Sequence, residues 1–265
     1  MRHMEATIGA LKDKQMWSKV PAITIFFWII KVMATTVGET AADFLNFNLN
    51  WGLTGTTLLM GGFLVIALIL QFRSKKYTAG IYWLAVLLIS VLGTLITDNL
   101  TDNFGVPLAL TTLIFGLALA ATFWAWYASE KTLSIHSIYT AKREGFYWLA
   151  ILFTFALGTA AGDWFSEGLN LGYGVSALIF VALIGIVTFA YYALRLDAVL
   201  AFWIAYILTR PLGASVGDYL SQPRDEGGLG WGTTGINIFF LVTILALVLY
   251  LTRTKRDVVS VQHEG

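Results

Sequence analysis

The sequence contains no cysteine and few charged residues, and both shortages exclude whole classes of protein. Without cysteine the chain forms no disulfide and no thiolate metal site, and it has no cysteine nucleophile. Only 12% of its 265 residues are charged, whereas 57% are hydrophobic, and the mean hydropathy is +0.73. Soluble domains use about a quarter charged residues to cover their surface. The composition therefore predicts a multispanning membrane protein whose partner is the lipid bilayer.

Signatures of nucleic-acid binding and of hydrolytic catalysis are missing as well. The formal net charge is only +1, so no basic surface for nucleic acid is expected. The sequence has no H-E-x-x-H, Walker A or G-x-S-x-G motif, and we expect neither an enzyme nor a bound cofactor. The first twenty residues lack an apolar core, which argues against a cleavable signal peptide.

Eight apolar segments are long enough to cross a bilayer, which takes roughly 20 residues per helix. They define a membrane domain at 21–252, between an N-terminal segment at 1–20 and a tail at 253–265. Of the 17 lysine and arginine residues, 14 lie in the tails and in the loops on the same side, and only Arg224 lies in the opposite loops. The positive-inside rule therefore predicts that both termini are cytoplasmic.

The eight segments form four similar units, each with a tryptophan in its first helix. A glycine follows that tryptophan by ten residues and an aspartate follows it by fifteen. Because a two-helix unit returns the chain to the same side, all units share one orientation around an axis along the membrane normal. We predict an all-α integral membrane fold of eight transmembrane helices, arranged as four tandem helical hairpins. The units lie at about 22–72, 79–128, 145–193 and 197–252, with tryptophans Trp28, Trp83, Trp148 and Trp203.

Four segments carry a resemblance to a known family. They read WIIKVMATTVGETAADF, YWLAVLLISVLGTLITDNLTDN, YWLAILFTFALGTAAGD and FWIAYILTRPLGASVGDYLSQP. The pattern resembles the bacterial uncharacterised membrane-anchored proteins, which are built from four tandem two-helix repeats of unknown function. The resemblance implies this fold and a multi-pass location in the bacterial inner membrane, and it assigns no reaction.

A polar stripe runs along the first helix of every unit, where steps of four residues keep side chains near one face. Ionised groups inside a membrane are costly and are candidates for function by default. The ligand candidates on this stripe are carboxylates and hydroxyls, whose oxygen atoms favour hard ions such as Mn²⁺, Mg²⁺, Ca²⁺ or H⁺. The expected cation ligands are Asp43, Asp98, Asp163, Asp218 and Glu39, and the expected ion pathway includes Lys31, Arg210, Thr35, Ser90, Thr94 and Thr159.

Small residues ten and fourteen positions after each tryptophan predict close packing of the first helices around the axis. This packing would gather the four aspartates into a ring, although capping of helices at the outer face is an alternative role for them. We expect Arg210 to pair with a buried carboxylate, and Lys31 to be either an interfacial anchor or part of an ion pair. The repeated tryptophans are interpreted as interfacial anchors.

The leading functional interpretation is a transporter for a small cation, best a Mn²⁺-like divalent metal, coupled to protons. The divalent cation would be bound as substrate, and alternating access would rock residues 20–128 against 145–252. One alternative is a transporter or channel for an organic or anionic solute that uses Lys31 and Arg210. Another is a non-transporting membrane scaffold or stress sensor. The sequence leaves open whether the protein forms a homo-oligomer.

Overall fold

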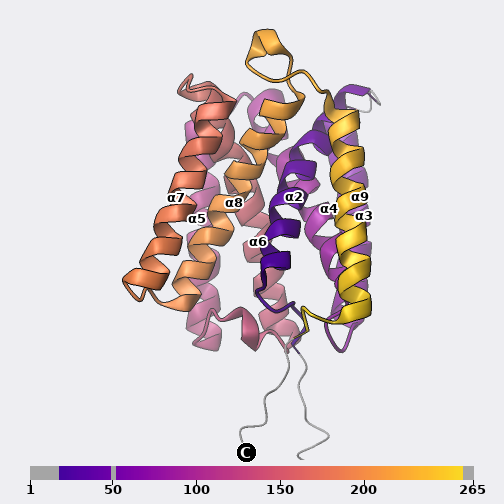
Figure 1. Cartoon of the computed structure of the whole chain (residues 1–265), viewed down its shortest axis with the longest axis vertical. Coiled ribbons are helices and arrows are strands. Elements are labelled where there is room, and N and C mark those ends of the chain that lie inside the picture. Colours follow the sequence, from indigo (N-terminus) through magenta and orange to yellow (C-terminus); the bar gives the residue numbers. More distant parts are fainter. Residues whose placement is uncertain (1–17, 49–51, 259–265) are drawn as a thin grey trace, which may run out of the picture.

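The computed structural model describes residues 18–48 and 52–258, and within these ranges it contains helices and no strand (Figure 1). All eight long helices are long and apolar enough to cross a membrane, which confirms the predicted eight-span fold. Three of the helices begin at a capping residue of the kind that favours a helix start. The side chains of Thr24, Thr140 and Asp197 accept hydrogen bonds from backbone N–H groups in the first turns of the helices that follow them. The helices are α2 (Ile25–Asp43), α3 (Gly52–Arg73), α4 (Ala79–Asp98), α5 (Leu108–Glu130), α6 (Ala141–Asp163), α7 (Tyr173–Ala193), α8 (Ala198–Ser221) and α9 (Thr233–Thr254).

The helices form an inner ring enclosed by an outer layer. Helices α2, α4, α6 and α8, the first of each repeat, contact one another in that order, and α8 closes the ring on α2 (Figure 1). The most apolar part of each inner helix is 61–67% buried, against 11–28% for the outer helices α3, α5, α7 and α9. The inner helices are therefore shielded from lipid by protein, and the outer helices supply the lipid-facing surface.

Each outer helix packs chiefly on the inner helix of the following repeat. Helix α3 contacts α4, α5 contacts α6, α7 contacts α8, and α9 returns to contact α2. The α9–α2 contact includes a pair of hydrogen bonds, in which the Thr40 hydroxyl donates to the Asn237 side chain and the Asn237 amide donates to the Thr40 carbonyl. The four hairpins are thus interlocked around the axis, because the outer helix of each hairpin packs on the inner helix of the next.

The repeated glycines bring neighbouring inner helices into close contact. A Cβ atom on Gly38 would lie 1.8 Å from the Ser90 hydroxyl oxygen, and one on Gly213 would lie 2.0 Å from that of Thr35. The same contact joins each repeat to the next around the whole ring, which confirms the predicted close packing of small residues. The contacting pairs are Gly38 with Ser90, Gly93 with Phe155, Gly158 with Arg210, and Gly213 with Thr35.

The end of the bundle that carries residues 18–24 and Asp257 is called here the terminal end, and the opposite end the far end. At the terminal end the Lys19 ammonium lies 2.6 Å from the Glu144 carboxylate and donates to the Phe72 carbonyl at 3.0 Å. The Gln71 amide also donates to Glu144, at 3.1 Å. This buried network ties the segment before α2 to the end of α3 and the start of α6.

A second contact closes the terminal end near the C-terminal side of α9. The Tyr77 hydroxyl donates to the buried Asp257 carboxylate, whose backbone carbonyl accepts from the Ala22 amide at 2.8 Å. Burial, together with the bond to Asp257, raises the pKa of the Tyr77 phenol. Tyr77 therefore remains a neutral donor, and the segment before α2 is held on both sides.

The repeated tryptophans lie inside the protein, so their interpretation as interfacial anchors is wrong. Trp83, Trp148 and Trp203 are buried, and Trp28 is half-buried. The Trp203 indole donates to the Leu133 carbonyl at 2.9 Å. The enclosing outer helices explain the difference, because an amphipathic ring near the membrane interface is exposed to lipid only on an outer helix.

Candidate cation site

Three carboxylates from three inner helices converge near the far end of the ring. One oxygen each of Glu39 on α2, Asp163 on α6 and Asp218 on α8 lie within 4.8 Å of one another. Glu39 and Asp218 are buried, and Asp163 is half-buried. This spacing is compatible with a shared cation, and hard cations take oxygen ligands of this kind.

The structure places the remaining two predicted aspartates outside this group of three. Asp43 and Asp98 are half-buried at the same level of the bundle. Asp43 accepts a long hydrogen bond of 3.4 Å from the Gln222 amide. The inner ring therefore brings together two of the four repeated aspartates, with Glu39 as the third carboxylate.

A π-helical turn follows the repeated aspartate in three of the four repeats. The turns span Phe44–Asn48, Asn99–Asn103 and Trp164–Gly168, whereas α8 continues as α-helix through Asp218 to Ser221. Neither Asp98 nor Asp163 donates or accepts a capping hydrogen bond to the turn that follows it. Local capping therefore does not account for these two carboxylates, and π-turns frequently mark functional sites. Hydropathy and the repeat do not predict these turns, although the aspartates that precede them mark their position.

Arg210 lies below the three carboxylates and pairs with one of them, which confirms the predicted buried ion pair. Its guanidinium is fully buried, and its Nη2 atom lies 2.9 Å from the Glu39 carboxylate. The same nitrogen donates to the hydroxyls of Thr94 and Thr159, the latter at 2.6 Å. Asp163 and Asp218 have no basic partner among the residues that the structure describes.

Lys31 occupies a position that neither of its expected roles describes. Its ammonium is fully buried between two rings, 4.1 Å from the Phe155 centroid and 4.2 Å from the Tyr206 centroid. Within residues 18–48 and 52–258 it has no hydrogen-bond partner and no carboxylate within salt-bridge distance. The interpretations as an interfacial anchor and as an ion pair are both wrong, because the lysine points into the ring one layer below Arg210 and stacks on aromatic faces.

Thr35 and Ser90 lie in the contacts between inner helices. The Thr35 hydroxyl donates to the carbonyls of Val32 and Thr209, at 2.6 and 3.2 Å. Ser90 packs against Gly38, and its hydroxyl is buried without a partner. Of the predicted hydroxyl groups, only Thr94 and Thr159 contact Arg210, and Thr94 also lies 3.4 Å from the Glu39 carboxylate.

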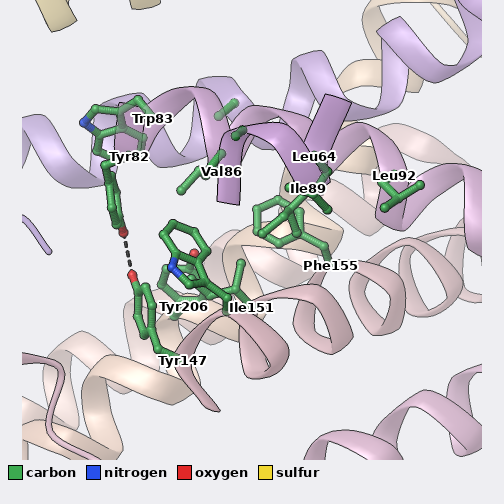
Figure 2. Packing of buried hydrophobic residues seen from close by; sticks show 14 of the residues in the cluster. Leu64, Tyr82, Trp83, Val86, Ile89, Leu92, Tyr147, Ile151, Phe155 and Tyr206 are labelled. Atoms are coloured by element: carbon green, nitrogen blue, oxygen red, sulfur yellow. Dashed lines mark hydrogen bonds between the residues drawn. The ribbon is translucent and has the colours of Figure 1, made fainter. Parts of the chain in front are cut away.

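Below Lys31, aromatic side chains fill the ring toward the terminal end. The Tyr82 and Tyr147 hydroxyls share a hydrogen bond across the ring, with Tyr206 near them, whereas Phe155 lies farther along the ring toward Arg210 (Figure 2). All four side chains are buried. Asp43, Asp98 and Asp163 are half-buried, whereas Arg210, Lys31 and these four aromatic side chains are buried between the carboxylates and the terminal end.

Comparisons with known proteins identify a repeat and no function. A family model described as a repeat of unknown function, DUF347, matches residues 26–77, 81–132, 146–196 and 201–257, most of the chain. Each matched segment contains one inner helix and the outer helix that follows it, which confirms the predicted resemblance to a family of four tandem repeats. No curated protein and no solved structure matches the chain.

Proposed function

This chain belongs to the DUF347 family of repeats of unknown function, and we propose that it is a membrane transporter for a small hard cation. The best candidate is a Mn²⁺-like divalent metal with proton coupling. The observation that carries the proposal is the approach of the Glu39, Asp163 and Asp218 carboxylates to within 4.8 Å inside an eight-span bundle. Three such groups balanced by a single guanidinium are costly in a membrane unless a cation or protons compensate them.

The donor set favours hard cations over soft ones. The three candidate ligand atoms are carboxylate oxygens, and the chain has no cysteine. Carboxylate and hydroxyl oxygens suit Mn²⁺, Mg²⁺ and Ca²⁺, whereas Cu⁺ prefers thiolates and thioethers. Carboxylates that approach this closely also take up protons readily when no metal is bound, which provides a route to proton coupling.

The helix contacts indicate which parts of the bundle would move together. A rocking of residues 20–128 against 145–252 would separate α5 from α6, one of the broadest contacts in the protein, and also α9 from α2. A division that keeps each outer helix on its inner partner groups α9, α2, α3 and α4 as body one, and α5, α6, α7 and α8 as body two. Only the contacts of the inner ring then have to change, and shear or rocking of this kind is common in transporters with parallel repeats.

The candidate site lies at the boundary between these two bodies. Glu39 belongs to body one, and Asp163 and Asp218 belong to body two. The contacts that close the terminal end cross the same boundary, because Tyr82 bonds to Tyr147 and the end of α3 meets Glu144 through Lys19. A movement of body two against body one would therefore open the terminal end and dismantle the site together, as alternating access requires.

The test is binding and flux of Mn²⁺ by the purified protein in lipid. We expect Mn²⁺ to raise the melting temperature and to enter proteoliposomes, and Asp163→Asn and Asp218→Asn to abolish both effects. The matched control is Asp102→Asn, since Asp102 is an exposed carboxylate in the π-turn after α4. Wild-type binding and flux in both variants would refute the site. Stabilisation by an organic anion and by no metal would favour the alternative solute.

A further inference from the structure

Three oxygens from three different repeats converge on a single nitrogen of Arg210. Its Nη2 atom contacts the Glu39 carboxylate at 2.9 Å, the Thr159 hydroxyl at 2.6 Å and the Thr94 hydroxyl. The three residues occupy the same position, eleven residues after the tryptophan of repeats one, two and three. In repeat four this position is Ala214, and the arginine enters from the turn below it. The three side chains are called here the oxygen cage.

The other two nitrogens of the guanidinium lack hydrogen-bond acceptors within residues 18–48 and 52–258. Nε and Nη1 of Arg210 are buried and have no hydrogen-bond partner in the part of the chain that the structure describes. Arginines that form permanent buried pairs usually engage a carboxylate through two parallel N–H groups. Buried donors without acceptors destabilise a fold. The geometry resembles a cation seated in an oxygen cage more closely than an ion pair optimised for stability.

Glu39 belongs to the oxygen cage and to the candidate cation site at once. Its carboxylate contacts Arg210 and also approaches Asp163 and Asp218 to within 4.8 Å. A metal that draws on this carboxylate weakens its attraction for the guanidinium and repels the guanidinium directly. Occupancy of the site and occupancy of the cage are therefore in competition.

We propose that Arg210 is a built-in competitor of the transported cation. It fills the oxygen cage when the three carboxylates hold no metal, and it is displaced from Glu39 when they do. This inference rests on the proposed function, and it separates the roles of Arg210, which competes, and of Lys31, which is held between rings one layer below.

Arg210 also makes contacts inside the ring that do not involve Glu39. Its stem lies against Gly158, where a Cβ atom would come within 2.3 Å of Cγ, so the close approach depends on glycine. The Phe155 ring centroid lies 5.8 Å from Cζ and offers a cation–π surface. A displaced guanidinium can therefore remain inside the protein without leaving a bare charge.

Thr94 provides a test, because its two possible roles predict opposite changes in Mn²⁺ affinity when its hydroxyl is removed. If Thr94 holds the competitor, Thr94→Val loosens Arg210 and tightens Mn²⁺ binding, by about tenfold in the dissociation constant. If the hydroxyl is a metal ligand, the same change weakens binding. Thr97→Val is the matched control, because the buried Thr97 hydroxyl donates only to the carbonyls of Gly93 and Ala156.

Arg210→Met extends the test, with an expected gain in Mn²⁺ affinity of about a hundredfold because a full positive charge is removed. Should this variant fail to fold, Thr94→Val and Thr159→Val carry the test alone, since both changes keep the side-chain volume. Unchanged or weaker binding in these variants, or an equal gain in Thr97→Val, would overturn the competitor role while leaving the transporter proposal intact. Absence of Mn²⁺ binding by the wild-type protein would instead refute the proposed function itself.

Discussion

The two ends of the inner ring join the same two bodies by opposite chemistry. At the terminal end the bridging contacts are satisfied within the protein, as in the pairs Lys19 with Glu144 and Tyr82 with Tyr147. At the far end Glu39 faces two carboxylates, and among the residues described it pairs with one cation, a guanidinium with two unpartnered nitrogens. The terminal end is therefore bridged by matched pairs, whereas at the far end like charges face one another and a bound cation or protons would compensate them.

The largest expected effect is at the terminal end, where breaking the buried ion pair should destabilise the whole bundle. Lys19→Met leaves Glu144 charged and fully buried without its partner. Loss of one partner of a buried pair costs about 3–5 kcal/mol. The measurement is the unfolding free energy in lipid or detergent. Lys142→Met is the control, because the Lys142 side chain is 64% exposed beside Glu130. Equal losses in both variants would show that the terminal end is not closed by this pair.

Substitutions at the glycine contacts should cost less and should affect both ends alike. Gly38→Ala places a methyl group 1.8 Å from the Ser90 hydroxyl oxygen, so α2 and α4 must separate or distort. Overpacking of this kind costs about 1–3 kcal/mol. Gly185→Ala, on the outer helix α7, has no neighbouring atom within 4 Å of the added carbon and should leave the melting temperature unchanged or raise it. A tolerant Gly38 would contradict the close packing of the ring.

Neutralising a carboxylate should raise the stability of the metal-free protein at the far end and lower it at the terminal end. Asp218→Asn removes one of three converging negative charges, and it should raise the metal-free stability by on the order of 1 kcal/mol. Glu144→Gln, at the terminal end, removes the partner of Lys19 and should lower it. The measurement is the melting temperature in a chelator, followed by the loss of the Mn²⁺ response in Asp218→Asn. A destabilised Asp218→Asn would show that this carboxylate is already compensated within the protein.

The fold could be predicted from the sequence because hydropathy and the repeat are local signals. The expected end of the first unit at about 72 and the start of the second at about 79 differ from the end of α3 (Gly52–Arg73) and the start of α4 (Ala79–Asp98) by at most one residue. The repeat also indicated that the first helices meet around an axis through their glycines. It gave no sign that α3 would pack on α4 or α9 on α2, because the choice of neighbour depends on contacts between distant segments.

The sequence predicts which residue types form the candidate site better than it predicts how these residues are arranged. Glu39 and Arg210 could be predicted as site residues, because charged residues are rare within apolar membrane spans. Symmetry then suggested four equivalent aspartates, whereas the structure groups two of them with Glu39, a residue that breaks the repeat. Lys31 was misplaced because its partners, Phe155 and Tyr206, come from two other helices and look like ordinary apolar core in the sequence.

The smallest expected effect concerns the hydrogen bond between the Tyr82 and Tyr147 hydroxyls, which joins the two bodies across the aromatic layer (Figure 2). Hydrogen bonds between membrane helices contribute about 0.6 kcal/mol on average, so Tyr82→Phe should lower the melting temperature only slightly. The same loss should favour the state that is open at the terminal end, because the bond exists only while the two bodies are together there. We therefore expect faster Mn²⁺ exchange in proteoliposomes at nearly unchanged binding affinity. Tyr192→Phe, on the exposed face of α7, is the control. Unchanged flux in Tyr82→Phe would mean that the Lys19–Glu144 network alone sets the barrier at the terminal end.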